Sequence, residues 1–93
     1  MQVDVIRAQH ARLEAALTAL TSLVSPPDER VARAAAEVER AFAGGLPVWA
    51  ERDVATIRAL AAAPDRLSDA DRARLARAFV DLYTVACREY WTA

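Results

Sequence analysis

A heptad-like pattern of apolar residues runs through the first quarter of the chain. The positions follow each other at alternating steps of three and four residues, and one of them is His10, the single histidine. The members are Val3, Ile6, His10, Leu13, Leu17, Leu20 and Val24. This spacing is typical of a long helix that packs along a coiled-coil-like seam. It predicts a helix over 3–24 with His10 inside the seam.

Proline and glycine residues divide the rest of the chain into three further segments with helical periodicity. Pro26 and Pro27 end the first helix because they supply no backbone N–H donor, and Gly44 and Gly45 favour the end of a second helix. Pro64 closes a third segment. We therefore expect helices over about 26–43, 48–63 and 68–91 in addition to 3–24.

Two residue pairs are typical of helix starts. Ser25 is followed three residues later by Asp28, and Ser68 is followed three residues later by Asp71. In a capping box the two side chains each accept a hydrogen bond from the other residue's backbone N–H group. These pairs predict N-terminal caps for the second and fourth helices.

The fourth helical segment is apolar around most of its circumference. An inner stripe is expected to enter the core, and a second apolar stripe lies beside it at helical spacing. The inner stripe is Leu75, Phe79, Leu82, Ala86 and Tyr90, and the second stripe is Val80, Tyr83, Cys87 and Trp91. A helix of this kind is either central in its domain or shared with another chain.

Length and composition predict one folded helical domain over 1–93. With 55% apolar and 27% charged residues, the chain is too apolar to be disordered. Its 23 alanines favour helix but bury little area each, so the core is expected to be thin. We expect an all-α, four-helix antiparallel bundle with long-short-short-long helices. In a monomer, parts of the first and fourth helices would lack cover, which favours a homodimer through these helices.

Charge and residue usage argue against several classes of function. The net charge is −1, and acidic residues flank the densest basic run at Arg72, Arg74 and Arg77, so no nucleic-acid partner is expected. One cysteine and one histidine cannot supply the usual metal sites, so no metal or cofactor is expected. The sequence shows neither a signal peptide nor a membrane-spanning stretch, which predicts a cytoplasmic protein without a membrane partner.

His10 is the one catalytic candidate that the sequence offers. With Arg7 and Glu14 one turn away on either side, it could act as an acid–base group or accept a phosphoryl group. Histidine phosphotransfer domains are helical bundles of similar size, and a phosphotransfer-like domain is one alternative. Such domains place the histidine on a second long helix beside a lysine and a glycine, which this chain lacks there. A structural role in the core or at an interface is the stronger interpretation.

Cys87 leads to a second alternative, a small helical enzyme or ligand carrier. Its bundle pocket would be lined by His10, Glu14, Tyr83 and Cys87. A nucleophilic thiol needs a base, and only His10 could serve. The apolar neighbours of Cys87 predict instead a buried, unreactive thiol.

The aromatic end of the fourth helix is the best candidate for contact with another molecule. Tyrosine and tryptophan are enriched at interface centres, although these rings could also cap the core. No residue set forms a catalytic signature. We therefore expect a small non-catalytic protein–protein interaction module that uses apolar faces of the first and fourth helices: an adaptor, a chaperone-like subunit or an inhibitor. The expected partner-binding residues are Val80, Tyr83, Cys87, Tyr90 and Trp91.

Overall fold

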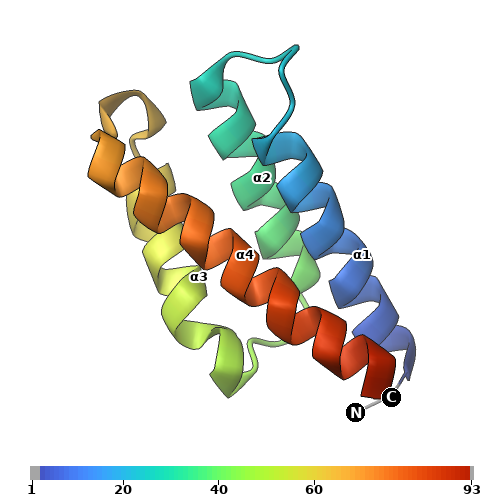
Figure 1. Cartoon of the computed structure of the whole chain (residues 1–93). Helices are drawn as coiled ribbons and strands as arrows, with labels where there is room; N and C mark the ends of the chain where they lie inside the picture. The colour runs from blue at the N-terminus through green and yellow to red at the C-terminus, as the bar shows by residue number, and fades with distance from the viewer. Residues whose placement is uncertain (1–2, 93) are drawn as a thin grey trace.

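The helical periodicity of the sequence is realised as four α-helices and one short 3-10 helix in the computed structural model, which describes residues 3–92 (Figure 1). The elements are α1 (Val3–Leu20), α2 (Pro27–Ala41), α3 (Val48–Ala61), η1 (Pro64–Arg66) and α4 (Asp69–Thr92). No strand occurs between residues 3 and 92. The predicted all-α, four-helix fold is confirmed.

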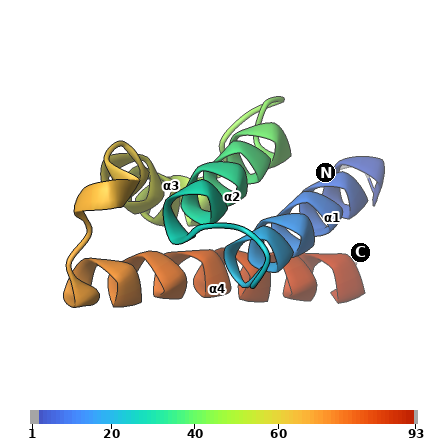
Figure 2. The same ribbon diagram turned by 90° about the horizontal axis from the view of Figure 1, so that it is seen from above.

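α4 is the longest helix, with 24 residues, and it forms one side of the molecule (Figure 2). It packs against both α1 and α3, while α2 packs against α1 and α3. The start of α1 and the end of α4 lie at the same end of the molecule (Figure 1). The radius of gyration is 12.7 Å, close to the value of about 12 Å for a compact domain of this length.

The core lies between the four helices and uses the predicted inner stripe of α4. Leu75, Phe79, Leu82 and Ala86 are buried, as expected, whereas Tyr90 is half-buried. The largest fully buried side chains come from all four helices: Leu13, Val38, Val54, Ile57, Leu75, Phe79 and Leu82. Alanines at 16, 34, 50, 78 and 86 fill the positions between them, so the helices approach closely.

The predicted extent of the first helix was wrong at its C-terminal end. α1 ends at Leu20, and the side chains of Leu23 and Val24 are 89% and 95% exposed in the loop that follows. The last turn closes with hydrogen bonds from Thr21 to the carbonyl oxygen of Leu17. Pro26 disfavours helical backbone at Ser25, so the helix could not continue into α2, and the chain uses residues 21–26 as the connection.

The buried face of α1 is also rotated from the predicted seam. Ile6, Gln9, Leu13 and Ala16 are buried, whereas His10 is half-buried at the edge of the contact. Gln9 is the one buried polar residue of residues 3–92. The heptad pattern alone placed His10 inside the seam, but α1 must contact both α2 and α4, and its buried face points between them.

The two predicted capping boxes had different outcomes. At the start of α4, the Ser68 hydroxyl accepts a hydrogen bond from the backbone N–H of Asp71 at 3.1 Å, and an Asp71 carboxylate oxygen accepts from the N–H of Ser68 at 3.4 Å. The box at Ser25 and Asp28 does not form, because the residue before α2 is Pro26 and no side chain caps it. The Ser25 carbonyl oxygen instead accepts a hydrogen bond from Arg30 at 2.6 Å.

This difference predicts unequal effects of two serine substitutions. Ser68→Ala removes a cap and should lower the free energy of unfolding by about 1 kcal/mol. Ser25→Ala removes a side chain that caps no helix, so it should change stability much less. Urea denaturation of both variants measures the contrast, and equal losses would mean that the Ser68 cap contributes nothing specific.

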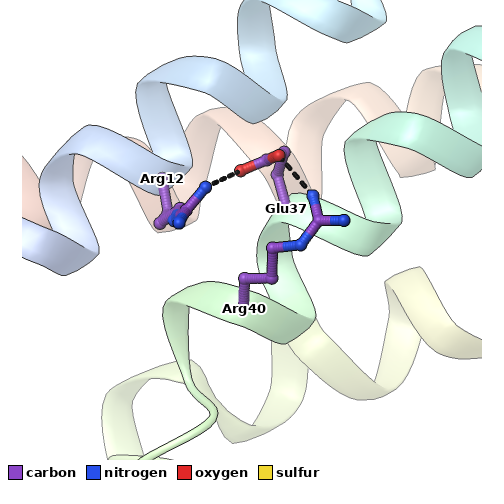
Figure 3. Close-up of polar contacts among 3 residues, drawn as sticks. All are labelled: Arg12, Glu37 and Arg40. Atoms are coloured by element: carbon purple, nitrogen blue, oxygen red, sulfur yellow. Dashed lines mark hydrogen bonds and ion pairs between the residues drawn. The ribbon is translucent and has the colours of Figure 1, made fainter.

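An ion-pair group joins α1 to α2 on the outside of the fold (Figure 3). The Glu37 carboxylate lies 3.3 Å from Arg12 Nη1 across the helix contact and 2.6 Å from Arg40 Nη1 one turn along α2. The arginines are more than half exposed, so solvent screens the pairs. They orient the two helices more than they stabilise them.

Candidate functional site

His10 meets the aromatic end of α4. Tyr83 and Tyr90 lie two turns apart and therefore project from the same side of α4. The imidazole stacks on Tyr90, with ring centroids 4.5 Å apart and planes 22° apart, and lies tilted against Tyr83 at 5.4 Å. His10 thus contributes to the contact that holds α4 against α1.

Glu14 and Cys87 complete this group, which we call the His10 cluster: His10, Glu14, Tyr83, Cys87 and Tyr90. The Tyr83 hydroxyl donates a hydrogen bond to Glu14 Oε2 at 3.5 Å. Hydrogen bonding to Cys87, burial, and the negative charges of Cys87 and Glu14 raise the pKa of Tyr83 to about 12. The prediction that Cys87 is buried was wrong: it is half-buried, because it lies at the edge of the α1–α4 contact.

The His10 cluster brings together the four residues that the ligand-carrier hypothesis named. The His10 ring packs against both Tyr83 and Tyr90 at the contact between the two helices. A surface hollow of about 460 Å³ begins at Glu14 but runs toward Ser25 and Arg33, and neither His10 nor Cys87 lines it. Residues 3–92 contain no group of three side chains that could hold a metal ion. The arrangement is that of a helix contact with a partly exposed edge.

The raised pKa of Tyr83 predicts a specific loss of stability in alkali. Folding favours the neutral phenol, whose ordinary pKa is 10.0, so this contribution is complete below pH 10 and is lost as the pH rises through about 12. The difference in unfolding free energy between the wild type and Tyr83→Phe should therefore fall over this range. Denaturation at several alkaline pH values measures it. A constant difference would show that the phenol environment is not perturbed.

A second feature is an uncharged stripe on the outer side of α4. We call it the α4 outer stripe: Ala73, Ala76, Val80, Thr84, Cys87 and Trp91. Successive members are three or four residues apart, so they share one side of the helix. Trp91 is 80% exposed and Val80 is 50% exposed. Half of the Val80 surface and most of the Trp91 surface therefore remain in water.

The stripe contains only part of the predicted partner-binding set. Val80 and Trp91 lie on it as exposed residues, Cys87 lies at its edge, and Tyr83 and Tyr90 lie between it and α1. The Trp91 ring meets Tyr90 edge-on at 5.2 Å, which links the stripe to the His10 cluster. Neither of the two apolar stripes predicted for this helix included Thr84 or the alanines at 73 and 76. Their small size and lack of charge were the available signal.

Charged residues line the border of the stripe on the side of α3. Arg77, Asp81 and Arg88 are exposed there, and Arg77 Nε lies 3.9 Å from Asp81 Oδ2. Between this border and α3 is a polar hollow of about 450 Å³ that also contains Asp53. Burial, and then the charge of Asp81, raises the pKa of Asp53. This part of the surface carries two aspartates that repel each other.

No described helix is both long enough and apolar enough to cross a membrane. Comparison of the chain with protein-family models, with curated proteins and with solved structures gave no match.

Proposed function

We propose that this chain is a small non-catalytic protein–protein interaction module that binds through the α4 outer stripe and the adjoining part of α1. An adaptor, a chaperone-like subunit and an inhibitor are roles of this kind. The observation that supports it is the exposure of Trp91 and Val80 on one uncharged helical face. Contiguous exposed apolar surface is typical of interaction sites, and tryptophan is enriched among the residues that contribute most binding energy.

The surroundings of the stripe fit this role. The His10 cluster holds the C-terminal half of α4 against α1, so the stripe is presented by a rigid element. The exposed charges of Arg77, Asp81 and Arg88 supply a polar rim. A rigid apolar centre with a polar rim is the usual organisation of a protein interface.

The proposal includes an antiparallel bundle and a homodimer. The connections over 21–26 and 42–47 are short, and short connections favour antiparallel neighbours. The start of α1, where Val3 is exposed, and the end of α4, which carries the exposed Trp91, lie at the same end of the molecule (Figure 1). A two-fold dimer through α1 and α4 would cover apolar surface that one copy leaves in water.

A ligand carrier or small enzyme is the alternative, since His10, Glu14, Tyr83 and Cys87 lie together. It requires the stacked rings to separate and admit a ligand. His10→Ala would open that space, so increased uptake of a small aromatic probe by this variant alone would mean that the wild-type cluster is closed. Probe binding by the wild type, lost in His10→Ala, would favour the carrier. A phosphotransfer role would require an accessible imidazole nitrogen despite the stacking, and acid-labile phosphate on His10 would reveal it.

Site-specific photocrosslinking tests the interaction module. A photoreactive residue at Val80 should give a defined protein adduct in the cells that make the chain, and Trp91→Ala should abolish it. The matched control is the same residue at Ala32, which is exposed on α2 away from the stripe. Equal labelling from positions 80 and 32, or an adduct that persists in Trp91→Ala, would contradict the proposal.

A further inference from the structure

We propose that the α4 outer stripe is occupied by a second copy of this chain, with the two α4 helices antiparallel and Arg88 of each copy paired with Asp81 of the other. This inference rests on the proposed interaction function and names its partner. Two observations support the inference. The first is the order of the charges of Asp81 and Arg88 along one border of the stripe, and the second is the placement of the small and large side chains within the stripe.

The charges on this border form a self-complementary pattern, because a two-fold rotation brings the aspartate of one copy to the arginine of the other. Asp81 and Arg88 are exposed, lie seven residues apart, and border the same side of the stripe. Seven residues correspond to about 10.5 Å along the helix. A two-fold axis perpendicular to α4, midway between them at Thr84 and Val85, places each aspartate at the height of the other copy's arginine. Two ion pairs then form, one on each side of the axis.

Other arrangements are less favourable. In a parallel pair of α4 helices, with the two-fold axis along the helices, the border that carries Asp81 and Arg88 in one copy lies on the opposite side of the contact from the same border in the other copy, so neither ion pair forms. Within residues 3–92, Arg88 makes no ion pair, and Asp81 has only Arg77 at 3.9 Å. Asp81 also lies near Asp53, whose raised pKa reflects burial and the charge of Asp81. Arg88 from a second copy would supply a cation where two carboxylates repel each other.

The apolar side chains fit the same register. An axis midway between residues 84 and 85 places residue 80 of one copy at the height of residue 89 of the other. Val80 therefore faces the space between Cys87 and Trp91 of the second copy. Thr84 lies beside the axis and faces Thr84, so a small side chain stands where the helices approach most closely. No charged residue belongs to the stripe itself, so contact would not bury an unpaired charge. An unrelated protein would not require this internal symmetry.

A charge-swap series measured by sedimentation equilibrium tests the pairing. The wild type should dimerise in a concentration-dependent manner, and Asp81→Arg or Arg88→Asp alone should each weaken the dimer roughly tenfold. The double variant should restore wild-type affinity. Arg66→Asp, a charge reversal on η1, is the matched control and should have no effect. Circular dichroism of each variant establishes that it is folded.

Disulfide crosslinking tests the direction of the helices. In a Cys87→Ala background, Thr84→Cys places the two thiols at heights that differ by about 1.5 Å along the helices. The wild-type Cys87 thiols differ by about 7.5 Å along the same direction. Mild oxidation should therefore link Thr84→Cys dimers several-fold faster than wild-type dimers. A parallel dimer would link Cys87 directly, and that result would overturn the proposal.

Failure of this inference can be separated from failure of the proposed function. A monomer at every concentration, or a double variant that does not regain affinity, would overturn the second-copy proposal. If the Trp91-dependent adduct from position 80 then contains another protein, the interaction function stands with a different occupant. If that adduct is also absent, both proposals fail.

Discussion

Replacement of Phe79 by alanine is expected to remove most of the stability of the chain. Phe79 is 1% exposed and lies at the centre of the buried side of α4. Loss of a buried aromatic side chain leaves a cavity that close-packed neighbours cannot refill, and the cost is about 3–5 kcal/mol. A domain of this size is stable by only about 5–15 kcal/mol in total, so the variant should be close to unfolding.

Chemical denaturation followed by circular dichroism measures this loss. Trp91→Ala is a demanding control, because it removes a larger ring from the same helix but from a position that is 80% exposed. Under dilute conditions, where a dimer does not contribute, its unfolding free energy should change far less than that of Phe79→Ala. Similar losses in the two variants would mean that the described core is not the one that stabilises α4.

Overpacking at Ala34 is expected to give the second largest loss of stability. This residue of α2 is completely buried in the core, between larger side chains. Leucine would add apolar area, but a filled core has no space for three more carbon atoms, and the helices would have to move apart. The expected cost is about 1–3 kcal/mol, or more if the backbone cannot shift.

Ala32→Leu is the matched comparison for this change. It makes the same substitution two residues earlier on α2, where the side chain is exposed. Both residues are good helix formers, so helix propensity changes little in either variant. Thermal unfolding should show a lower midpoint for Ala34→Leu than for Ala32→Leu. A gain of stability in Ala34→Leu would reveal unfilled space near α2.

Local signals in the sequence were sufficient where the physics is local. The ends of α2, α3 and α4 lie within about two residues of the predicted ends, because proline, glycine and the Ser68–Asp71 box act on the adjacent backbone. Gly45, for example, has a φ of 146° in the turn after α2. Four of the five predicted members of the inner stripe of α4, Leu75, Phe79, Leu82 and Ala86, are buried, because helical periodicity places them on one face.

The same kind of signal failed where two influences competed. At Ser25 the sequence contains a capping box, but Pro26 and Pro27 fix the backbone at the start of α2, and the box does not form. At the end of α1 the apolar rhythm continues to Val24, but the chain needs those residues to turn toward α2. A pattern of apolar residues indicates which side chains could be buried. The connections between the helices decide which of these side chains are buried.

The sequence by itself determined the all-helical class and the excess of apolar surface on the fourth helix. The tertiary structure decided which of that surface remained exposed: α1 covers Tyr83 and Tyr90 through His10, while Val80 and Trp91 are left in water. Residues 10 and 90 are far apart along the chain, so no local pattern could predict their contact. Helical periodicity sets the face on which a side chain lies, and the packing of whole helices sets what that face meets.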